Sequence, residues 1–395
     1  MALSIEYKLL AYCAQAEIND KKNIKLKELL NKNLDWPYIL EESIGQGIPC
    51  LLYHNLSQFA QKIPHDIRNK LKEIYYINTY RNIDAYQEMN VIFSSFNKKN
   101  IKFIPLKGVF LAEKVYNNIA LRPMADIDIL VKKEELPKVD KLLNSSGYST
   151  SIRKELLRRA IKKAYLNSVD YFKNDRKSPT LHIHWHIVNV SLPTYMYTAN
   201  IRMKKFWEAA MPAKIAGTKT LQLAPRHLII CLAEHALKHS FDKLLLLSDI
   251  DAVIKKYNER MDWENLIKDT VEFNMQRQVF YGLYFTGYFL GARIPNYVLP
   301  KLKPQKTGLL ERRFFYSVAG NNRKAKLCYF VYLNMVNGIL KKSKFIFRTL
   351  FPPPPVIALA LNLNKSKVTI KDYILFLQKK ILRLKECLSF FSGNR

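Results

Sequence analysis

Cysteine is scarce in this sequence, and the few cysteines lie far apart. Cys13, Cys50, Cys231, Cys328 and Cys387 form no CxxC pair and follow no regular spacing. Disulfide frameworks and zinc ribbons need paired or regularly spaced cysteines, so the sequence argues against both. Isolated cysteines of this kind are typical of a reducing compartment, and we expect a cytoplasmic protein.

Long apolar runs and several phosphate-binding or hydrolase motifs are also missing. The longest apolar stretches, 278–292 and 327–340, are shorter than the roughly 18 to 20 residues that a bilayer core demands, so we expect buried helices and no transmembrane segment. The amphipathic N-terminus contains acidic residues and does not resemble a signal peptide. Without GxxxxGK[ST], GxGxxG or GxSxG motifs, P-loop, Rossmann and hydrolase interpretations lack support.

Acidic residues are outnumbered by basic ones. The chain has 33 Asp and Glu against 64 Lys and Arg, which gives a formal net charge of +31. This charge favours a polyanionic partner, namely nucleic acid, an anionic membrane surface or the phosphates of a nucleotide. Because the excess lysine is spread over the whole chain, a generally basic, solvated surface explains the charge equally well.

The 395 residues, 48% of them hydrophobic, exceed what one hydrophobic core usually organises. Helical periodicity predicts a helical N-terminal region over 1–98. Strand-like and helical segments alternate over 99–225, and a helical domain follows over 226–300. Residues 301–395 are predicted to form a basic helical C-terminal region, in which the proline run 352–355 must interrupt any helix.

Residues 102–148 are the most informative part of the middle region. KFIPL predicts a strand, Lys107 and Gly108 a tight turn, and VFLAEKVY a helix. A loop with Arg122 and Pro123 follows, then the strand DIDILV and a second helix that ends at Gly147. The functional candidates lie at the turn, in the loop and on the second strand.

Asp126 and Asp128 share one face of the second strand, because successive side chains of a strand point to opposite sides. Ile127, Ile129 and Val131 share the other face, which can enter a core. Two neighbouring carboxylates facing outward repel each other unless a cation lies between them. Oxygen ligands at this spacing suit Mg²⁺, which completes its coordination shell with waters and substrate phosphates.

The turn before the first helix suits the same substrate. A glycine between a strand and a helix lets backbone N–H groups approach a phosphate, and the helix N-terminus adds its positive end. We therefore expect Gly108 and Lys107 to cradle phosphates and Arg122 to neutralise their charge.

The ordered set LKG, helix, RPMADIDILV, helix and GY resembles the core of the uncharacterised bacterial nucleotidyltransferases of the DNA polymerase beta superfamily. LHIHWH (181–186) resembles the carboxylate-L-H-W strand of that family, and LAEHALKH with LLLLSDI (232–250) resembles its helical half. The resemblance covers roughly residues 50–300. It implies an α+β fold, with a polymerase-beta-type nucleotidyltransferase core containing a small mixed sheet, flanked by N-terminal and C-terminal helical regions.

The resemblance also implies an activity, namely transfer of a nucleoside monophosphate from a nucleoside triphosphate to an acceptor. The acceptor would offer a hydroxyl or similar group on a protein, peptide, glycan or small molecule. Asp126 and Asp128 would bind the metal cofactor, Mg²⁺ or Mn²⁺.

The sequence departs from the family at one position. The family usually supplies a third carboxylate at the start of the L-H-W strand, and His182 holds that place. A histidine can ligate a metal or take a proton, but it adds no negative charge and suits Mn²⁺ better than Mg²⁺. We place His182 where the missing carboxylate would activate the acceptor, and Asp170 in the neighbouring SVDYFK segment is an alternative third carboxylate.

Several histidines admit more than one interpretation. His182, His184 and His186 alternate and would share one strand face, either as a metal site or as ordinary strand residues. His235 and His239, four apart on a predicted helix, would contact the nucleotide or acceptor across a cleft, or pack in the interior.

A second D-x-D, formed by Asp249 and Asp251, lies in a helical pattern. Residues two apart on a helix diverge around its axis, so these two cannot share a metal. We expect Asp249 to be a structural or interdomain partner.

Two other classes of function remain open. One is a catalytically impaired nucleotide-binding or scaffolding module, in which the histidine at position 182 marks the loss of activity. The other is a basic nucleic-acid-binding protein. Aromatic residues among the cations of RRFFYSVAG and KKSKFIFRTLF also allow contact with an anionic surface through the basic C-terminal region.

Overall fold

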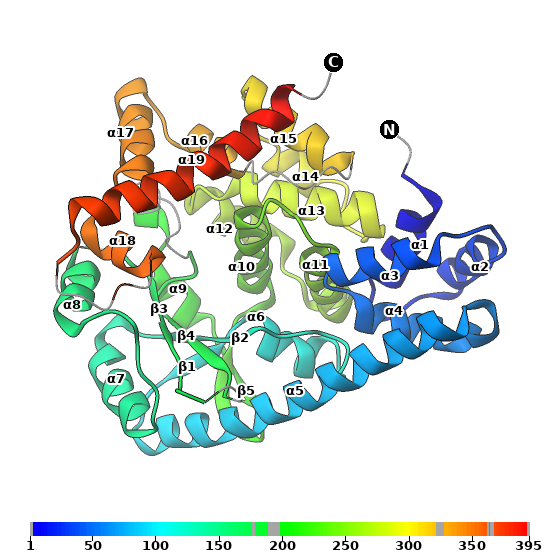
Figure 1. Cartoon of the computed structure of the whole chain (residues 1–395), viewed down its shortest axis with the longest axis horizontal. Helices are drawn as coiled ribbons and strands as arrows, with labels where there is room; N and C mark the ends of the chain where they lie inside the picture. The colour runs from blue at the N-terminus through cyan, green and yellow to red at the C-terminus, as the bar shows by residue number, and fades with distance from the viewer. Residues whose placement is uncertain are drawn as a thin grey trace.

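The computed structural model describes residues 3–163, 165–175, 178–188, 198–320, 328–361, 363 and 367–392. A small sheet lies between the long helix α5 and a group of helices that includes α10 and α11 (Figure 1). The predicted α+β class is therefore confirmed, with helix in clear excess.

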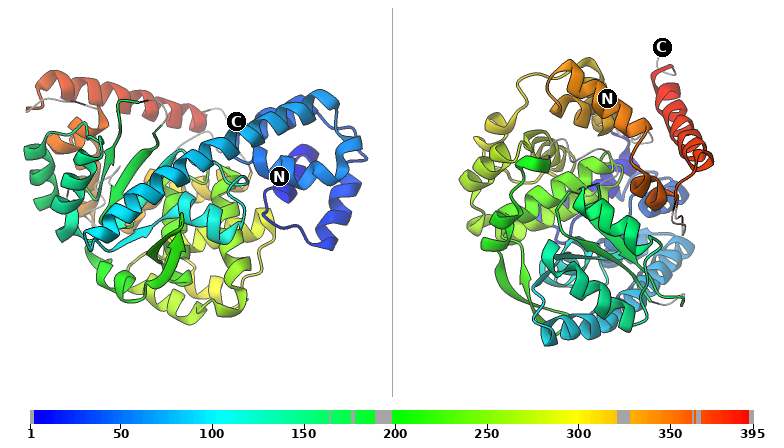
Figure 2. Two further views of the ribbon diagram at one scale, coloured as in Figure 1. Left: turned by 90° about the horizontal axis from the view of Figure 1, so that it is seen from below. Right: turned by 90° about the vertical axis from the view of Figure 1, so that its left-hand side faces the viewer.

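The N-terminal region is helical, as predicted for residues 1–98. Its helices are α1 (Ile5–Cys13), α2 (Asp20–Leu29), α3 (Trp36–Gly45), α4 (Pro49–Leu56), the 3₁₀ helix η1 (Ser57–Lys62) and α5 (His65–Lys98). The side chains of Ser4, Asn19 and Asp35 accept backbone N–H groups of the first turns of α1, α2 and α3. Helix α5, with 34 residues, extends from the other N-terminal helices to the sheet (Figure 2).

A four-stranded mixed sheet forms the centre of the middle region. Its strands are β1 (Phe103–Pro105), β2 (Asp126–Val131), β3 (Ser168–Tyr171) and β4 (Thr180–His184), in the order β1-β2-β4-β3. Strand β2 runs parallel to β4, and the two outer pairings are antiparallel. Ile127, Ile129 and Val131 are buried, so the apolar face of β2 enters the core as the alternation predicts.

The first helix of the middle region differs from the prediction for VFLAEKVY. It begins at Lys107 with one α-helical turn, α6 (Lys107–Phe110), and continues as a π-helical turn, η2 (Leu111–Val115). The N–H of Tyr116 donates to the carbonyl of Leu111 at 2.8 Å, five residues back, as in a π-helix. The predicted helix is therefore present, and its second turn has π-helical hydrogen bonds, which helical periodicity does not distinguish from α-helical ones.

The predicted second helix is present, and a hairpin not singled out in the sequence follows later. The helical elements are η3 (Lys133–Glu135), α7 (Leu136–Ser145), α8 (Lys154–Lys162), η5 (Thr198–Asn200) and α9 (Met203–Glu208).

Strands β5 (Met211–Ile215) and β6 (Thr218–Gln222) form the hairpin, whose turn residues Ala216 and Gly217 both have positive φ. Thr220 Oγ1 donates to the carbonyl of Phe103 at 3.0 Å, which joins the hairpin to β1.

A bundle of helices covers the other side of the sheet. It contains α10 (Pro225–Lys238), α11 (Leu244–Tyr257), η6 (Asn258–Arg260), α12 (Trp263–Glu272) and α13 (Gln276–Leu290). Helices α10 and α13 pack closely, because a Cβ on Gly282 would lie only 2.9 Å from the Cβ of Ala233. Glycine at this position therefore sets the helix spacing.

The C-terminal region is helical where the structure describes it. Its helices are α14 (Val298–Leu302), α15 (Leu309–Ala319), α16 (Cys328–Met335), α17 (Ile339–Leu350), α18 (Pro354–Ala360) and α19 (Ile370–Ser392). Helix α17 ends before the proline run 352–355 and α18 begins within it, at Pro354, so the chain is not helical across the start of the run, as predicted. Among the described residues, none of the helices combines the length and the apolar character needed to cross a bilayer. The division into four regions stays a prediction.

Candidate active site

Asp126 and Asp128 lie on the same side of β2, but they differ in exposure. His182 Nδ1 is 3.3 Å from Asp128 Oδ1 and 3.9 Å from Asp126 Oδ2, so both carboxylates face the same imidazole. The Asp126 side chain is 48% exposed, whereas that of Asp128 is 4% exposed. The expectation that both acids face solvent was therefore wrong for Asp128, because neighbouring side chains cover it.

Three side chains contact a single oxygen of Asp128. Lys107 Nζ donates to Oδ1 at 2.9 Å, and His184 Nε2 lies 2.6 Å from the same atom. Burial alone would raise the pKa of Asp128, but Lys107 and the hydrogen bonds from His182 and His184 outweigh it and hold the pKa well below its usual range. Within the described residues, no hydrogen bond or ion pair reaches Oδ2, so this oxygen remains available to a cation.

The Asp126 carboxylate responds differently to the same surroundings. Partial burial and then the charge of Asp128 raise its pKa. A divalent cation shared by the two acids would remove this repulsion, because it attracts both carboxylates.

His184 is a neutral imidazole with one nitrogen unused. Burial, followed by the nearby His182, lowers its pKa to about 3. A neutral ring that donates through Nε2 to Asp128 carries its lone pair on Nδ1. Among the residues that the structure describes, Nδ1 of His184 is buried and has no hydrogen-bond partner. The ring can therefore fix Asp128 in place without adding a charge.

His182 occupies the middle of a row that crosses three strands. Its register partners are Asp128 on β2 and Asp170 on β3. Nε2 of His182 is 2.9 Å from Ser168 Oγ and 3.3 Å from Asp170 Oδ1, while Nδ1 faces the acid pair. The histidine therefore connects the acid pair with a third carboxylate.

His186 does not share the strand face with His182 and His184, contrary to expectation. Strand β4 ends at His184, and His186 Nδ1 accepts the backbone N–H of Val188 instead. His182, His184 and Asp128 do form a cluster, with one ligand atom from each within 4.8 Å of the others. Two imidazoles and a carboxylate are ligands that suit a transition metal such as Mn²⁺ better than Mg²⁺.

Lys107 and Gly108 lie beside the acid pair at the start of α6. Lys107 has a positive φ of 46°, is only 9% exposed and directs Nζ to Asp128. A Cβ on Gly108 would lie 2.6 Å from Arg122 Nη1 and 3.0 Å from Met124 Cγ. The glycine therefore makes room for the Arg122 guanidinium, a reason that differs from the phosphate contact predicted for it.

Arg122 is held by a buried carboxylate from the helical bundle. Its Nε and Nη2 donate to the two oxygens of Asp249 at 2.9 and 2.8 Å, and Tyr116 Oη is 3.0 Å from Asp249 Oδ1. Asp249 lies on α11, so the predicted role as a structural partner is confirmed. Asn82 of α5 also donates to the carbonyl of Arg122 at 3.0 Å, which fixes the loop before the acid pair.

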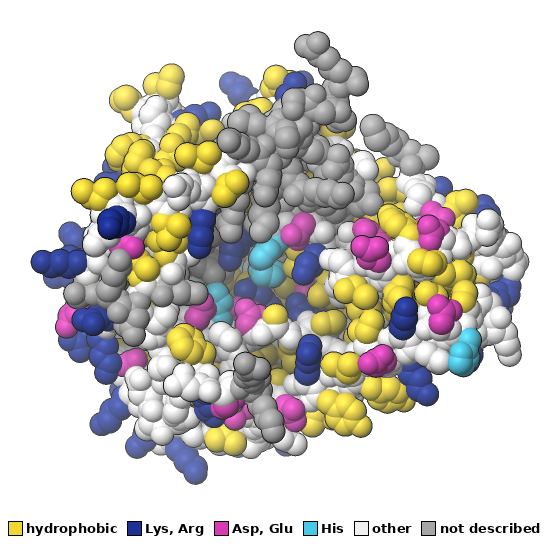
Figure 3. Space-filling model, viewed as in Figure 1, with side chains coloured by type: hydrophobic (Ala, Val, Ile, Leu, Met, Phe, Trp, Pro, Cys, Tyr) yellow, Lys and Arg dark blue, Asp and Glu magenta, His cyan; other side chains and the backbone are white. Residues whose placement is uncertain are grey.

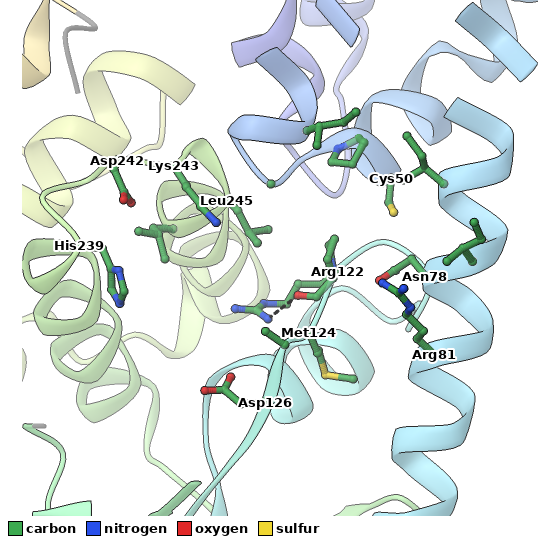
Figure 4. A pocket seen from close by; sticks show the side chains of 18 of the residues that line it. Cys50, Asn78, Arg81, Arg122, Met124, Asp126, His239, Asp242, Lys243 and Leu245 are labelled. Carbon is green, nitrogen blue, oxygen red and sulfur yellow. Dashed lines mark hydrogen bonds between the residues drawn. The ribbon is translucent and has the colours of Figure 1, made fainter. Parts of the chain in front are cut away.

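A cavity of about 690 Å³ opens beside Asp126. Figure 4 shows Asn78 and Arg81 on its α5 wall, and His239, Asp242 and Lys243 on the opposite wall. Its remaining lining comes mainly from α3, α4, the start of α11 and the loop 122–126. Figure 3 shows the molecule from the same side as Figure 1, and histidine, acidic and basic side chains gather there in a hollow near the centre.

Two basic lining residues, Arg81 and Lys243, were missed in the sequence. Each belongs to an ordinary stretch of helical periodicity that no motif distinguishes from other basic positions. Only the packing of the N-terminal helices against α10 and α11 brings them to one cavity. His235 and His239, considered as cleft residues from their spacing, do line it.

The sheet, the acid pair and the lining of the cavity all fall within one segment of the chain, residues 32–291, which matches a protein family. No curated protein matches the chain. A family model described as "Uncharacterised nucleotidyltransferase" matches residues 32–291, which is more than half of the chain. This match extends from the N-terminal helices that line the cavity to helix α13. The protein therefore belongs to this uncharacterised nucleotidyltransferase family.

Proposed function

We propose that the protein transfers a nucleoside monophosphate from a nucleoside triphosphate to a hydroxyl or similar group of an acceptor, on a core of the polymerase beta type. The observation that carries the proposal is the convergence of Asp126, Asp128 and His182 at the edge of the cavity. The acceptor is a protein, peptide, glycan or small molecule. The acceptor oxygen forms a bond to the α-phosphorus, and the bond to the β-phosphate oxygen breaks, so that pyrophosphate leaves.

The acid pair offers suitable ligands for a divalent cation. Asp126 and Oδ2 of Asp128 would hold Mg²⁺ or Mn²⁺. Such an ion aligns the phosphates and neutralises the charge that develops on them. Lys107 keeps Asp128 ionised for this purpose, since it holds the pKa of that carboxyl low.

His182 would act on the acceptor. In the tautomer that carries its proton on Nε2, toward Ser168 and Asp170, the lone pair of Nδ1 would accept the acceptor's proton. Asp170 would then stabilise the positive charge on the imidazole. A histidine with a carboxylate behind it would thus replace the third carboxylate of the family.

Lys107, Gly108 and Arg122 would form the boundary of the phosphate site. Their positions beside the acid pair and the cavity support this role. In the described structure, however, the two cations already have carboxylate partners, Asp128 and Asp249. Further cations are therefore needed to balance a triphosphate.

Calorimetric titration tests the proposal with ATP, GTP, CTP and UTP in the presence of Mg²⁺ or Mn²⁺. Asp126→Asn is a cleaner test than a variant of Asp128, because the exposed Asp126 can lose its charge without leaving the buried Lys107 unpaired. Asp84→Asn, at an exposed position on α5, is the matched control. We expect metal-dependent binding of at least one nucleotide, weakened about tenfold or more by Asp126→Asn alone. Equal affinity in all three proteins would contradict the proposed site.

The presence of histidine at position 182 favours one alternative, a nucleotide-binding module that has lost catalysis. His182→Glu separates the two possibilities. Loss of an existing turnover supports the enzyme, whereas turnover gained by an inert wild type supports the alternative. A nucleic-acid-binding function would instead show steep weakening of DNA or RNA binding with added salt.

A further inference from the structure

The wall of the cavity opposite α5 carries basic side chains that the proposed chemistry has not yet used. It is formed by the end of α10 and the beginning of α11. His235, His239, Asp242 and Lys243 line the cavity there, and Lys238 lies behind this lining on the same helical turn as the two histidines. Figure 4 shows His239 and Lys243 across the cavity from Arg122, with Asp126 at its lower end.

Lys238 is the most informative of these residues. It is half-buried, and within the described residues its ammonium group has neither a hydrogen bond nor an ion pair. Burial and then the charge of Lys107 lower its pKa, while Asp128, Glu234 and Asp126 act in the opposite direction. The Lys238 ammonium is therefore within electrostatic reach of the acid pair and of Glu234, although among the described residues no ion pair joins it to any of these carboxylates.

His235 experiences a similar surplus of positive charge. Burial, followed by Lys107 and His239, lowers its pKa well below the usual range. The ring of His235 lies 4.7 Å from that of His239, centre to centre. A polyanion bound at this wall would be attracted by Lys238 and Lys243 and would accept hydrogen bonds from the imidazoles.

We infer that Lys238, His239 and Lys243 bind the phosphate groups that leave as pyrophosphate, so that this wall is the polyphosphate site of the cavity. The inference rests on the nucleotidyl transfer proposed above and names the residues that take the leaving group. Positive groups fixed at this wall would stabilise the charge that grows on pyrophosphate as its bond to the α-phosphorus breaks. They supply the charge that Lys107 and Arg122 cannot, because carboxylates already neutralise those two.

Inorganic tripolyphosphate with Mg²⁺ is the probe for this wall, because it carries phosphates and no nucleoside. Calorimetry would compare the wild type with Lys238→Met and Lys243→Met, and Mg²⁺ with ATP would be titrated in parallel. Lys256→Met is the matched control, because Lys256 is exposed in the last turn of α11. Lys238→Arg tests whether restored charge restores binding, and thermal unfolding confirms that each variant is folded.

We expect Lys238→Met and Lys243→Met each to weaken tripolyphosphate and ATP binding about tenfold or more, since each removes a charged hydrogen-bond donor. Lys238→Arg should recover most of the affinity, and Lys256→Met should change it less than about twofold. Unchanged affinity in both wall variants, with Asp126→Asn still weakening ATP, overturns this inference alone. A wild type that binds neither tripolyphosphate nor any of the four nucleotides overturns the proposed function as well.

Discussion

Asp170 lies directly opposite His182 in the antiparallel pairing of β3 and β4, and its Oδ1 is 3.3 Å from the imidazole Nε2. The expected third carboxylate is therefore still on this face of the sheet, one strand further from the acid pair. A carboxylate behind an imidazole orients the ring and strengthens it as a base or ligand. We regard Asp170 as a positioning residue that acts through His182.

Replacing Asp170 with Asn should lower kcat about tenfold or more, because the imidazole loses its negatively charged partner. The KM for the nucleotide should change little, since Asp170 contacts His182 and not the cavity. Steady-state kinetics with the natural acceptor measures both constants, with Asp84→Asn as the control. Asp170→Glu should retain part of the activity. A rise in KM with kcat unchanged would show that Asp170 binds substrate directly.

Gly108→Ala should destabilise the protein by about 1 to 3 kcal/mol, as overpacking commonly does. The new methyl group would lie 2.6 Å from Arg122 Nη1, and Arg122 cannot withdraw without breaking its buried pair with Asp249. Urea unfolding followed by circular dichroism measures the change. Gly45→Ala in α3 is the control, because nothing lies within 4 Å of its Cβ. Equal stability of the two variants would mean that the Arg122 loop adjusts freely.

The strands that carry the site were largely predictable from the sequence, but the surroundings of the site were not. Strand β2 has the predicted bounds, because period-two alternation of Asp and apolar residues is a strong local signal. The same alternation cannot tell which face another element covers. Asp128 is buried because Lys107 and His184 reach it from other segments, and this follows only from the tertiary packing.

Long-range pairs were the other unpredictable part. Asp249 was expected to be a structural partner, yet nothing near it in the sequence points to Arg122, which lies 127 positions earlier. Lys243 lines the cavity because α11 packs over the sheet, whereas the sequence shows it only as one of 64 basic residues. Local patterns therefore predict elements and faces, and the partners of charged groups require the fold.

The contact of the C-terminal region with an anionic surface stays a prediction, and the exposed residues of α17 suit it. Ile339 and Leu340 on α17 are 81% and 83% exposed, with Lys341 and Lys344 exposed beside them. Hydrophobic side chains also gather over the corner where α17 and α18 lie (Figure 3). Apolar residues among lysines on one helix suit binding to an anionic lipid surface.

Vesicles of phosphatidylglycerol and phosphatidylcholine should therefore sediment the protein, and vesicles of phosphatidylcholine alone should not. Leu340→Ser combined with Lys344→Ser should weaken the binding about tenfold, since it removes buried apolar area and one charge. Tyr80→Ser, at an exposed position on α5, is the control. If the double variant bound anionic vesicles as the wild type does, the contact would lie elsewhere; preferential binding to RNA would instead indicate a nucleic-acid partner.

His227 should make the stability of the protein depend on pH. The residue is fully buried on α10, stacks on Phe206 and lies with Nε2 3.0 Å from Asp269 Oδ2. Asp269 already has two other cationic partners, Arg226 and Lys205. Burial and then the charge of Arg226 lower the pKa of His227 from 6.5 to about 4. Protonation of His227 in the folded protein is therefore unfavourable.

Between pH 6.5 and about 4 the unfolded chain binds a proton at His227 that the folded chain does not. The free energy of unfolding should therefore be highest above pH 6.5 and fall as the pH is lowered through this window. A shift of this size corresponds to a loss on the order of 2 kcal/mol between pH 7.5 and pH 5. Urea unfolding at a series of pH values measures it. His227→Gln should lose this part of the slope although it is less stable at pH 7.5, whereas His54→Gln, at an exposed position on α4, should keep the slope of the wild type. Parallel curves for the wild type and His227→Gln would show that other groups carry the pH dependence.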